Sequence, residues 1–254
     1  MRNIILILCT VLCILSCSKD DSGEENGLDT SGNSKTTGAS ANDFLSENEF
    51  PEMFIEIVYV EGFKPTETAI DNFVSFLEGR LNKPGGIVIE QRAIASPGIS
   101  EYSVTDVINI EKEHREKYNS GGQITVFGFF ADGEYAENTE NSSVLGIAYR
   151  NTSFAIFEET IRDFSGDAFA PALSVLETTV INHEFGHLLG LVNAGTTPQS
   201  EHQDTEHGKH CTEEDCLMYW TAETGEGLLS MFTGGAVPSL DPQCIADLQA
   251  NGGK

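Results

Sequence analysis

The segment 171–191 constrains the fold more than any other part of this 254-residue chain. It predicts one long helix, and apolar side chains surround its C-terminal half: Val180, Ile181, Phe185, Leu188 and Leu189. A helix that is apolar on all sides is buried, so we expect this one to lie in the core. Two histidines, His183 and His187, lie within the apolar stretch. Burial of an unpaired imidazole is unfavourable, so both side chains need specific partners.

The spacing of these histidines is that of a metal site. Residues four apart on a helix project from one face, so His183 and His187 can offer ring nitrogens to one ion. Glu184 leans toward the same side, where it can take a proton from an attacking water rather than bind the metal. The pattern H-E-x-x-H therefore predicts a zinc site with Glu184 as the general base of a hydrolytic reaction.

The remainder of the chain predicts a mixed fold. β-Branched and aromatic runs predict strands at 53–60, 87–89, 124–130, 144–149 and 154–157. Helical spacing of apolar residues predicts helices at 66–81 and 103–118. This order of elements indicates an α+β, or mixed α/β, domain with a twisted mixed sheet.

The residues H-E-F-G-H-L-L-G, followed downstream by a methionine, resemble the metzincin zinc peptidases. The resemblance implies a zincin domain with a long buried active-site helix and a Met-turn at Met218. It also implies that His183 and His187 bind zinc and that Glu184 is the catalytic base. An edge strand at 145–149 would hold an extended peptide substrate.

The third zinc ligand is where the chain departs from the metzincin pattern. That pattern has a histidine three residues after Gly190, whereas this chain has Asn193, whose amide oxygen is a poor zinc ligand. The segment H-C-x4-C-x-M, which is similar to archaemetzincins, begins instead at His210. The resemblance therefore implies an insertion within 191–209 and makes His210 the expected third ligand. The alternatives are His202, Asp204, His207 and Asn193.

Three cysteines, Cys211, Cys216 and Cys244, belong to the predicted domain. Archaemetzincins carry a C-x-x-C pair after the methionine that forms a second metal site, whereas this chain has only Cys244 there. That departure argues against a second zinc and favours a disulfide between Cys211 and Cys216. Such a bond persists in an oxidising compartment and would clamp the ligand loop to the Met-turn. Pairing of Cys244 with either of the other two is the alternative.

The N-terminus predicts export. Residues 1–16 combine a positive start with a short apolar run and indicate a signal peptide. The sequence Ile-Leu-Ser-Cys that ends at Cys17 resembles a bacterial lipobox, so we expect lipid on Cys17 to anchor the chain in the cell envelope, on an outer-membrane, periplasmic or cell-surface face. An ordinary secretory signal is the alternative. Residues 17–47 are polar and acidic and predict a flexible tether, which leaves 48–254 as the metzincin-like peptidase domain.

The formal net charge of −26 argues against nucleic acid as a partner. The chain as a whole therefore predicts a lipid-anchored zinc-dependent endopeptidase that hydrolyses extracellular or periplasmic polypeptides. The alternative is a non-catalytic surface lipoprotein that contains zinc. Asn193 supports that alternative, and the intact general base Glu184 opposes it.

Overall fold

The computed structural model describes residues 30–139, 142–166, 170–225 and 236–254. The predicted signal peptide, Cys17 and the first part of the predicted tether lie outside these residues. Within the described part of the chain, no helix is both long and apolar enough to cross a membrane.

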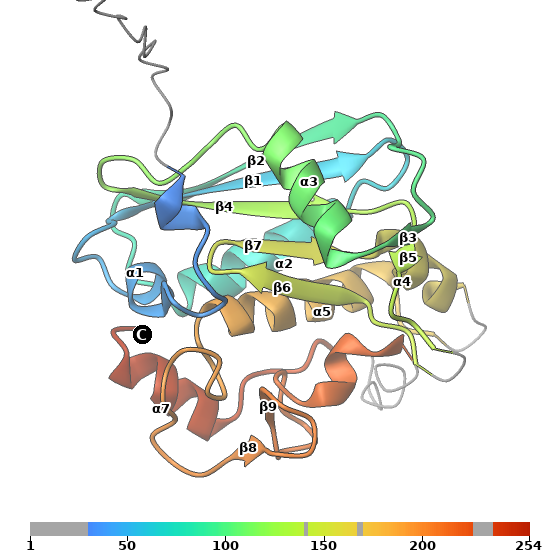
Figure 1. Cartoon of the computed structure of the whole chain (residues 1–254). Coiled ribbons are helices and arrows are strands. Elements are labelled where there is room, and N and C mark those ends of the chain that lie inside the picture. The colour runs from blue at the N-terminus through green and yellow to red at the C-terminus, as the bar shows by residue number, and fades with distance from the viewer. Residues whose placement is uncertain (1–29, 140–141, 167–169, 226–235) are drawn as a thin grey trace, which may run out of the picture.

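A five-stranded mixed sheet forms one layer of the molecule (Figure 1). Its strands, in spatial order, are β2 (Gly86–Ile94), β1 (Glu52–Val60), β4 (Gln123–Phe130), β7 (Ser153–Ile156) and β6 (Gly146–Arg150). Four of these strands run parallel, and β6 pairs antiparallel with β7 and forms one edge. β1 and β4 are buried along almost their whole length, as expected for central parallel strands with continuous apolar sequences.

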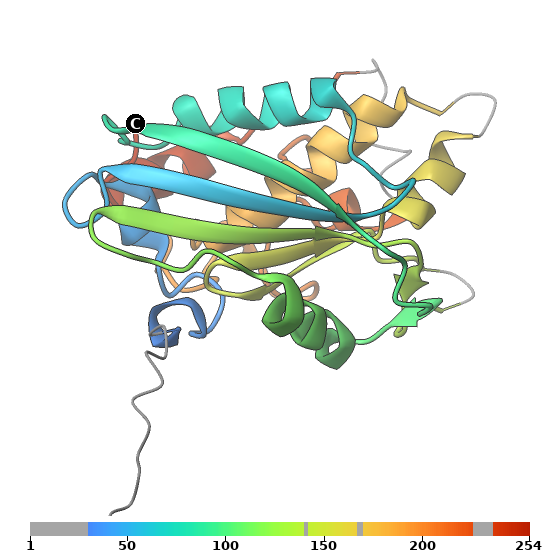
Figure 2. The ribbon, with the colours of Figure 1, turned by 90° about the horizontal axis from the view of Figure 1, so that it is seen from above.

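Helices cover both faces of the sheet (Figure 2). One face carries α2 (Glu67–Glu78), α4 (Glu158–Ser165) and α5 (Leu173–Leu188), and the other carries α3 (Val104–His114). Phe73 meets Phe154 and Phe185 edge to face, at ring-centroid distances of 6.4 and 5.2 Å, and so joins the sheet, α2 and α5 in one core.

The C-terminal part of the chain lies on the other side of α5 (Figure 1). Its elements are β8 (Gln203–Asp204), β9 (His210–Cys211), η2 (Trp220–Glu223) and α7 (Pro242–Ala250). Because α5 lies between this part and the sheet, every residue of α5 from 176 to 188 is buried. The short strands β3 (Glu101–Tyr102) and β5 (Glu134–Tyr135) pair with each other in a small separate sheet.

The predicted fold class is confirmed, with a mixed sheet and a long buried helix. Each predicted strand and helix has a counterpart, although α3 ends at His114 and not at residue 118. β2 runs on to Ile94 because it pairs with β1 residue by residue over nine positions. Helices α4 and α7 lie where the sequence analysis predicts none. For α7 a start signal is present, since Asp241 caps the helix by accepting from the amide of Cys244 and Pro242 follows it.

The predicted flexible tether is wrong for residues 30–47. This segment forms η1 (Ser31–Asn33) and α1 (Ala41–Leu45) and packs onto the domain. Phe44 and Leu45 are fully buried, and the Asn33 amide donates to the Thr125 carbonyl at 3.2 Å. Burial of Phe44 and Leu45 and the hydrogen bond of the Asn33 amide offset the entropy cost of ordering this segment. From its polar composition alone, that cost would be expected to keep the segment flexible. The folded domain therefore includes residues 30–47.

A buried carboxyl pair joins α4 to α5. Glu158 and Glu177 are both fully buried, and Glu177 accepts from the backbone amide of Thr66 at 3.1 Å, at the start of α2. Burial, and then the charge of Glu177, raise the pKa of Glu158 to about 9, although Arg162 at 2.6 Å favours the ionised form. Glu158 is therefore protonated in the folded protein at neutral pH.

This carboxyl pair predicts a pH dependence of stability. The folded protein holds a proton on Glu158 that the unfolded chain releases above pH 4.5, so the free energy of unfolding falls as pH rises from 4.5 toward 9. We expect Glu158→Gln, which keeps a neutral side chain, to remove up to about 4 kcal/mol of that fall. Urea unfolding at pH 5, 7 and 8.5 measures it, with the exposed Asp163→Asn on the same helix as control. A Glu158→Gln variant with the parent's pH dependence would contradict the assignment.

Candidate metal centre

Helix α5 carries three of the predicted site residues and turns sharply at its end. Gly190 has a φ of 79°, and the amides of Gly190 and Leu191 donate to the carbonyls of His187 (3.1 Å) and Gly186 (3.2 Å). This pair of bonds is a Schellman motif, which suits glycine because a side chain disfavours positive φ. The turn sends the chain into the segment 191–209, which returns to the helix at His210.

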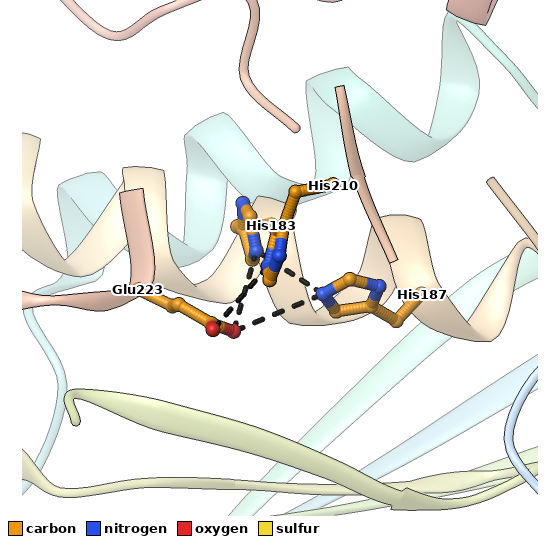
Figure 3. A group of neighbouring side chains, drawn as sticks. All are labelled: His183, His187, His210 and Glu223. Carbon is orange, nitrogen blue, oxygen red and sulfur yellow. Dashed lines mark hydrogen bonds and ion pairs between the residues drawn. The ribbon is translucent and has the colours of Figure 1, made fainter. Parts of the chain in front are cut away.

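The structure brings His183, His187 and His210 together (Figure 3). The Nε2 atoms of His183 and His187 are 3.1 Å apart, and the ring centroid of His210 lies 5.2 Å from each of the other two. All three side chains are buried or nearly so. Three imidazoles therefore converge from α5 and β9, as the H-C-x4-C-x-M alignment predicts.

The outer nitrogens of two rings are held by backbone carbonyls. Nδ1 of His183 donates to the Leu217 carbonyl at 2.7 Å, and Nδ1 of His210 donates to the His207 carbonyl at 2.6 Å. With the proton on Nδ1, each Nε2 presents a lone pair to the centre of the cluster. Nε2 of His210 is buried and forms no hydrogen bond within the described chain, although Oε1 of Glu223 lies 3.3 Å from it. Converging buried lone pairs without protons between them fit a bound cation, and three imidazoles suit zinc.

The charge state of His187 also suits a metal. Burial, opposed by the nearby Glu223 carboxylate, lowers the pKa of His187 to about 4. At His210 burial acts in the same direction, but the Glu223 carboxylate outweighs it and raises the pKa of that ring above its usual value. A neutral imidazole is the form that binds a metal ion.

Glu184 lies beside this cluster, under the edge strand. It is almost wholly buried, and its carboxylate accepts a hydrogen bond from the backbone amide of Ala148 in β6. Its Oε1 has no hydrogen-bond partner among the described residues. A side chain at Gly146 would meet the Glu184 Cγ at 2.8 Å, so the glycine leaves room for this carboxylate. Burial, and then the charge of Glu223, raise the pKa of Glu184 well above its usual value.

Met218 occupies a tight turn beneath α5. The amide of Tyr219 donates to the Cys216 carbonyl at 2.9 Å and closes the turn, and Met218 is fully buried. A side chain at Gly186 would meet the Met218 sulfur at 2.3 Å, so the helix approaches the turn closely between its two histidines. Because Leu217 in the same turn accepts from His183, the turn helps to orient that ring.

The alternative third ligands lie elsewhere. The Asn193 amide donates to Gln203 at 3.1 Å, and Asp204 pairs with the exposed His207 at 2.6 Å. His202 faces away from the three-histidine cluster toward a group of cysteines.

That second group contains the three cysteines and His202. Nδ1 of His202 lies 3.4 Å from the Cys211 sulfur and 3.9 Å from the Cys244 sulfur, and the sulfurs of Cys216 and Cys244 are 3.8 Å apart. Asp241 is also within the group, 2.9 Å from the Cys211 sulfur. The outer nitrogen of His202, Nε2, pairs with Asp247 at 2.8 Å. The group has the donors of a closed metal site.

The predicted disulfide between Cys211 and Cys216 is not formed, since all three cysteines are free. The segment 191–209 supplies His202 to this group. The sequence analysis gave His202 only as an alternative third zinc ligand, because spacing alone does not show which way the loop folds.

Three acidic residues near these clusters were not predicted. Glu223, at the end of η2, joins the three-histidine cluster, Asp241 lies beside the Cys211 sulfur, and Asp247 in α7 orients His202. None of them lies in a motif that the sequence analysis used. Asp241 alone has a local signal, since Asp241 followed by Pro242 is typical of a helix start.

A cleft of about 750 Å³ opens over the three-histidine cluster. Its walls include the backbone of β6 at 146–149, the base Glu184 and the ligand candidates His187 and His210. Thr37 from the N-terminal segment also lines it and donates to the Ala148 carbonyl at 2.9 Å. The cleft therefore joins a candidate metal, a carboxylate and a strand edge.

No protein-family model and no curated protein matches the chain. Among solved structures, the chain is similar to archaemetzincin from Methanopyrus kandleri, with a TM-score of 0.53 and 16% identity, over 79% of this chain and 96% of that one. The chain therefore has a fold similar to that of archaemetzincin. Metalloproteinase-II from Bacteroides fragilis matches with a TM-score of 0.42 and 14% identity, over 81% of this chain and 54% of that one, which is too low to add to this conclusion.

Proposed function

We propose that the chain is a zinc-dependent endopeptidase. The observation that carries the proposal is the convergence of three imidazoles beside a buried carboxylate, at the edge of an antiparallel strand. His183, His187 and His210 would hold the ion. When bound, zinc would lower the pKa of a water molecule and polarise the substrate carbonyl.

The protein's own groups would carry the protons. Glu184 has one carboxylate oxygen held near Ala148 and the other without a partner among the described residues, so the free oxygen can take the proton of the attacking water. The same carboxyl would then pass that proton to the leaving amine as the peptide C–N bond breaks.

A polypeptide substrate would bind as an extended strand. β6 is the edge of the sheet, and its residues 146–149 line the cleft beside Glu184. An extended peptide that adds to such an edge gains main-chain hydrogen bonds whatever its sequence.

The second cluster would hold a structural zinc. Neighbouring donors around a tetrahedral zinc lie about 3.5–3.8 Å apart when Zn–S bonds are near 2.3 Å, and the cysteine and histidine separations of 3.4 to 3.9 Å match this spacing. Four protein donors leave no position for substrate, so the role would be to stabilise the ligand-bearing loop.

The place of action follows from the N-terminus. We propose that lipid on Cys17 anchors the enzyme to a membrane of the cell envelope and that its partners are polypeptides there, not nucleic acids. Palmitate labelling of the parent and of Cys17→Ala would test the anchor.

The zinc assignment is tested by a matched pair of histidine variants. We expect His210→Ala to weaken zinc binding at the first site by more than about 100-fold and to abolish peptide hydrolysis. His207→Ala should change neither, since His207 is exposed three residues away in the same loop. Chelator competition, metal analysis and casein turnover measure both variants. Retention of full zinc affinity by His210→Ala would exclude it as a ligand, and tight zinc binding by the parent without hydrolysis of any substrate would favour the non-catalytic lipoprotein.

A further inference from the structure

Glu223 places a carboxylate among the three histidines (Figure 3). Its Oε1 lies 3.3 Å from Nε2 of His210. Its Oε2 lies 3.6 Å from Nε2 of His183 and 3.9 Å from Nε2 of His187. One side chain therefore approaches all three nitrogens that would face the ion.

The 3.3 Å separation is that of two ligands on one ion, and the contacts of 3.6 and 3.9 Å are longer than such a separation. Bonds of 2.0–2.1 Å to a tetrahedral zinc set neighbouring nitrogen and oxygen donors about 3.3 Å apart. The shortest of the three contacts meets this value, and the four donor atoms all lie within 4.8 Å of one another. Three histidines and a carboxylate complete a four-coordinate shell, which is the closed form of a zinc site.

We propose that Glu223 is a fourth protein ligand that closes the zinc site at rest and must withdraw before substrate and water can bind. The inference rests on the proposed peptidase function, since it assigns the regulation of that site. The rate of hydrolysis by the resting protein would then fall as the fraction of time that Glu223 is bound to the ion rises.

Backbone hydrogen bonds position Glu223 beside the three-histidine cluster. The Glu223 carbonyl accepts from the Leu145 amide at 2.9 Å, and the Gly225 amide donates to the Ser143 carbonyl at 2.9 Å. The segment is therefore paired with the chain that leads directly into β6. A peptide that adds to β6 enters the cleft beside this pairing, so substrate binding and Glu223 withdrawal would compete for the same space.

Glu184 is a second carboxylate in the cleft, and its position near Glu223 also favours a bound cation. Glu184 and Glu223 both line the cleft. Two carboxylates near each other in a largely buried site repel unless a cation lies between them. A dication held by Glu223 and the histidines would offset that repulsion while leaving Glu184 free of the metal.

The test is binding of a small zinc-directed inhibitor, which needs no peptide substrate. Acetohydroxamate is titrated by calorimetry into the zinc-loaded full chain, its Glu223→Gln variant and a Glu214→Gln control. Glu214 is exposed and lies in the segment between His210 and Met218. Zinc release to a chelator is followed for the same three proteins.

We expect Glu223→Gln to bind acetohydroxamate at least about tenfold more tightly than the parent, because no carboxylate has to leave first. It should also hold zinc about tenfold more weakly, since an amide is a poor zinc ligand. Glu214→Gln should match the parent in both. A gain of inhibitor affinity cannot arise from misfolding, so the result is independent of the variant's stability.

Unchanged or weaker hydroxamate binding by Glu223→Gln would overturn the proposal, because Glu223 would then not block the site. Unchanged zinc affinity would overturn it as well, since Glu223 would not be a ligand. Failure of the peptidase function has a different signature: neither the parent nor Glu223→Gln would hydrolyse any polypeptide, whatever their hydroxamate affinities.

Discussion

Glu184→Gln should lower kcat/KM for peptide hydrolysis by about 10²–10⁴-fold while leaving the zinc content unchanged. The loss follows from the position of the carboxylate, which is buried beside the three-histidine cluster with one oxygen free and the other held by Ala148. Glutamine keeps the volume of the side chain but cannot take a proton from water. Because Glu184 is not among the converging donors, its removal should not release the ion.

The measurement is turnover of a labelled polypeptide together with metal analysis. It should be repeated in the Glu223→Gln background, in which a closed resting site would no longer hide the loss. The exposed Glu206→Gln serves as control, since it removes a carboxylate from the loop that carries His210. If Glu184→Gln retained the parent's turnover, another group would have to be the base. If it lost zinc, Glu184 would be part of the ligand set and the proposed division of roles would fail.

The part of this site that lies in α5 could be predicted, because a single helix carries it. His183, Glu184 and His187 are fixed relative to each other by helical geometry, and the apolar residues around them indicate burial without reference to the rest of the chain. The strands were predictable for the same reason, since a run such as 124–130 needs only its own sequence to indicate a buried strand.

His210 was predictable only through a resemblance. Twenty-one intervening positions, 189–209, separate it from the end of α5, and no periodicity crosses such a loop. The pattern from His210 to Met218 was informative because the turn at Met218 is close to α5 and fixes where the histidine must lie.

The remaining residues depend on long-range folding. His202 lies in the same polar loop as His207, yet one is buried against Cys211 and the other is exposed. Composition could not separate them, because the direction of each side chain is set by the path of the loop. The segment 30–47 shows the same limit, since two apolar residues at Phe44 and Leu45 were enough to dock a stretch that is otherwise polar.

Loss of the second cluster should have the largest effect on stability. Cys211 follows His210 directly, and its amide donates to the Met218 carbonyl at 2.7 Å, so the cluster is tied to both the third histidine and the Met-turn. A metal that binds only the folded chain stabilises it by about 4 kcal/mol at 1,000 times its dissociation constant. We therefore expect Cys244→Ser and His202→Ala to lower the metal content from two ions per chain to at most one and to cost about 4 kcal/mol of stability.

Metal analysis and urea unfolding measure these variants, and alkylation with peptide mapping separates a metal from a disulfide. In the parent, Cys211, Cys216 and Cys244 should all resist alkylation until a chelator is added, and all three should then react without a reductant, since each is free. Thr212→Ala, which alters an exposed position next to Cys211, is the control and should behave as the parent. If only Cys244 reacted after chelation and unfolding, Cys211 and Cys216 would be joined by a disulfide. The loop that carries His210 would then be held by a covalent bond, and chelation would leave it in place.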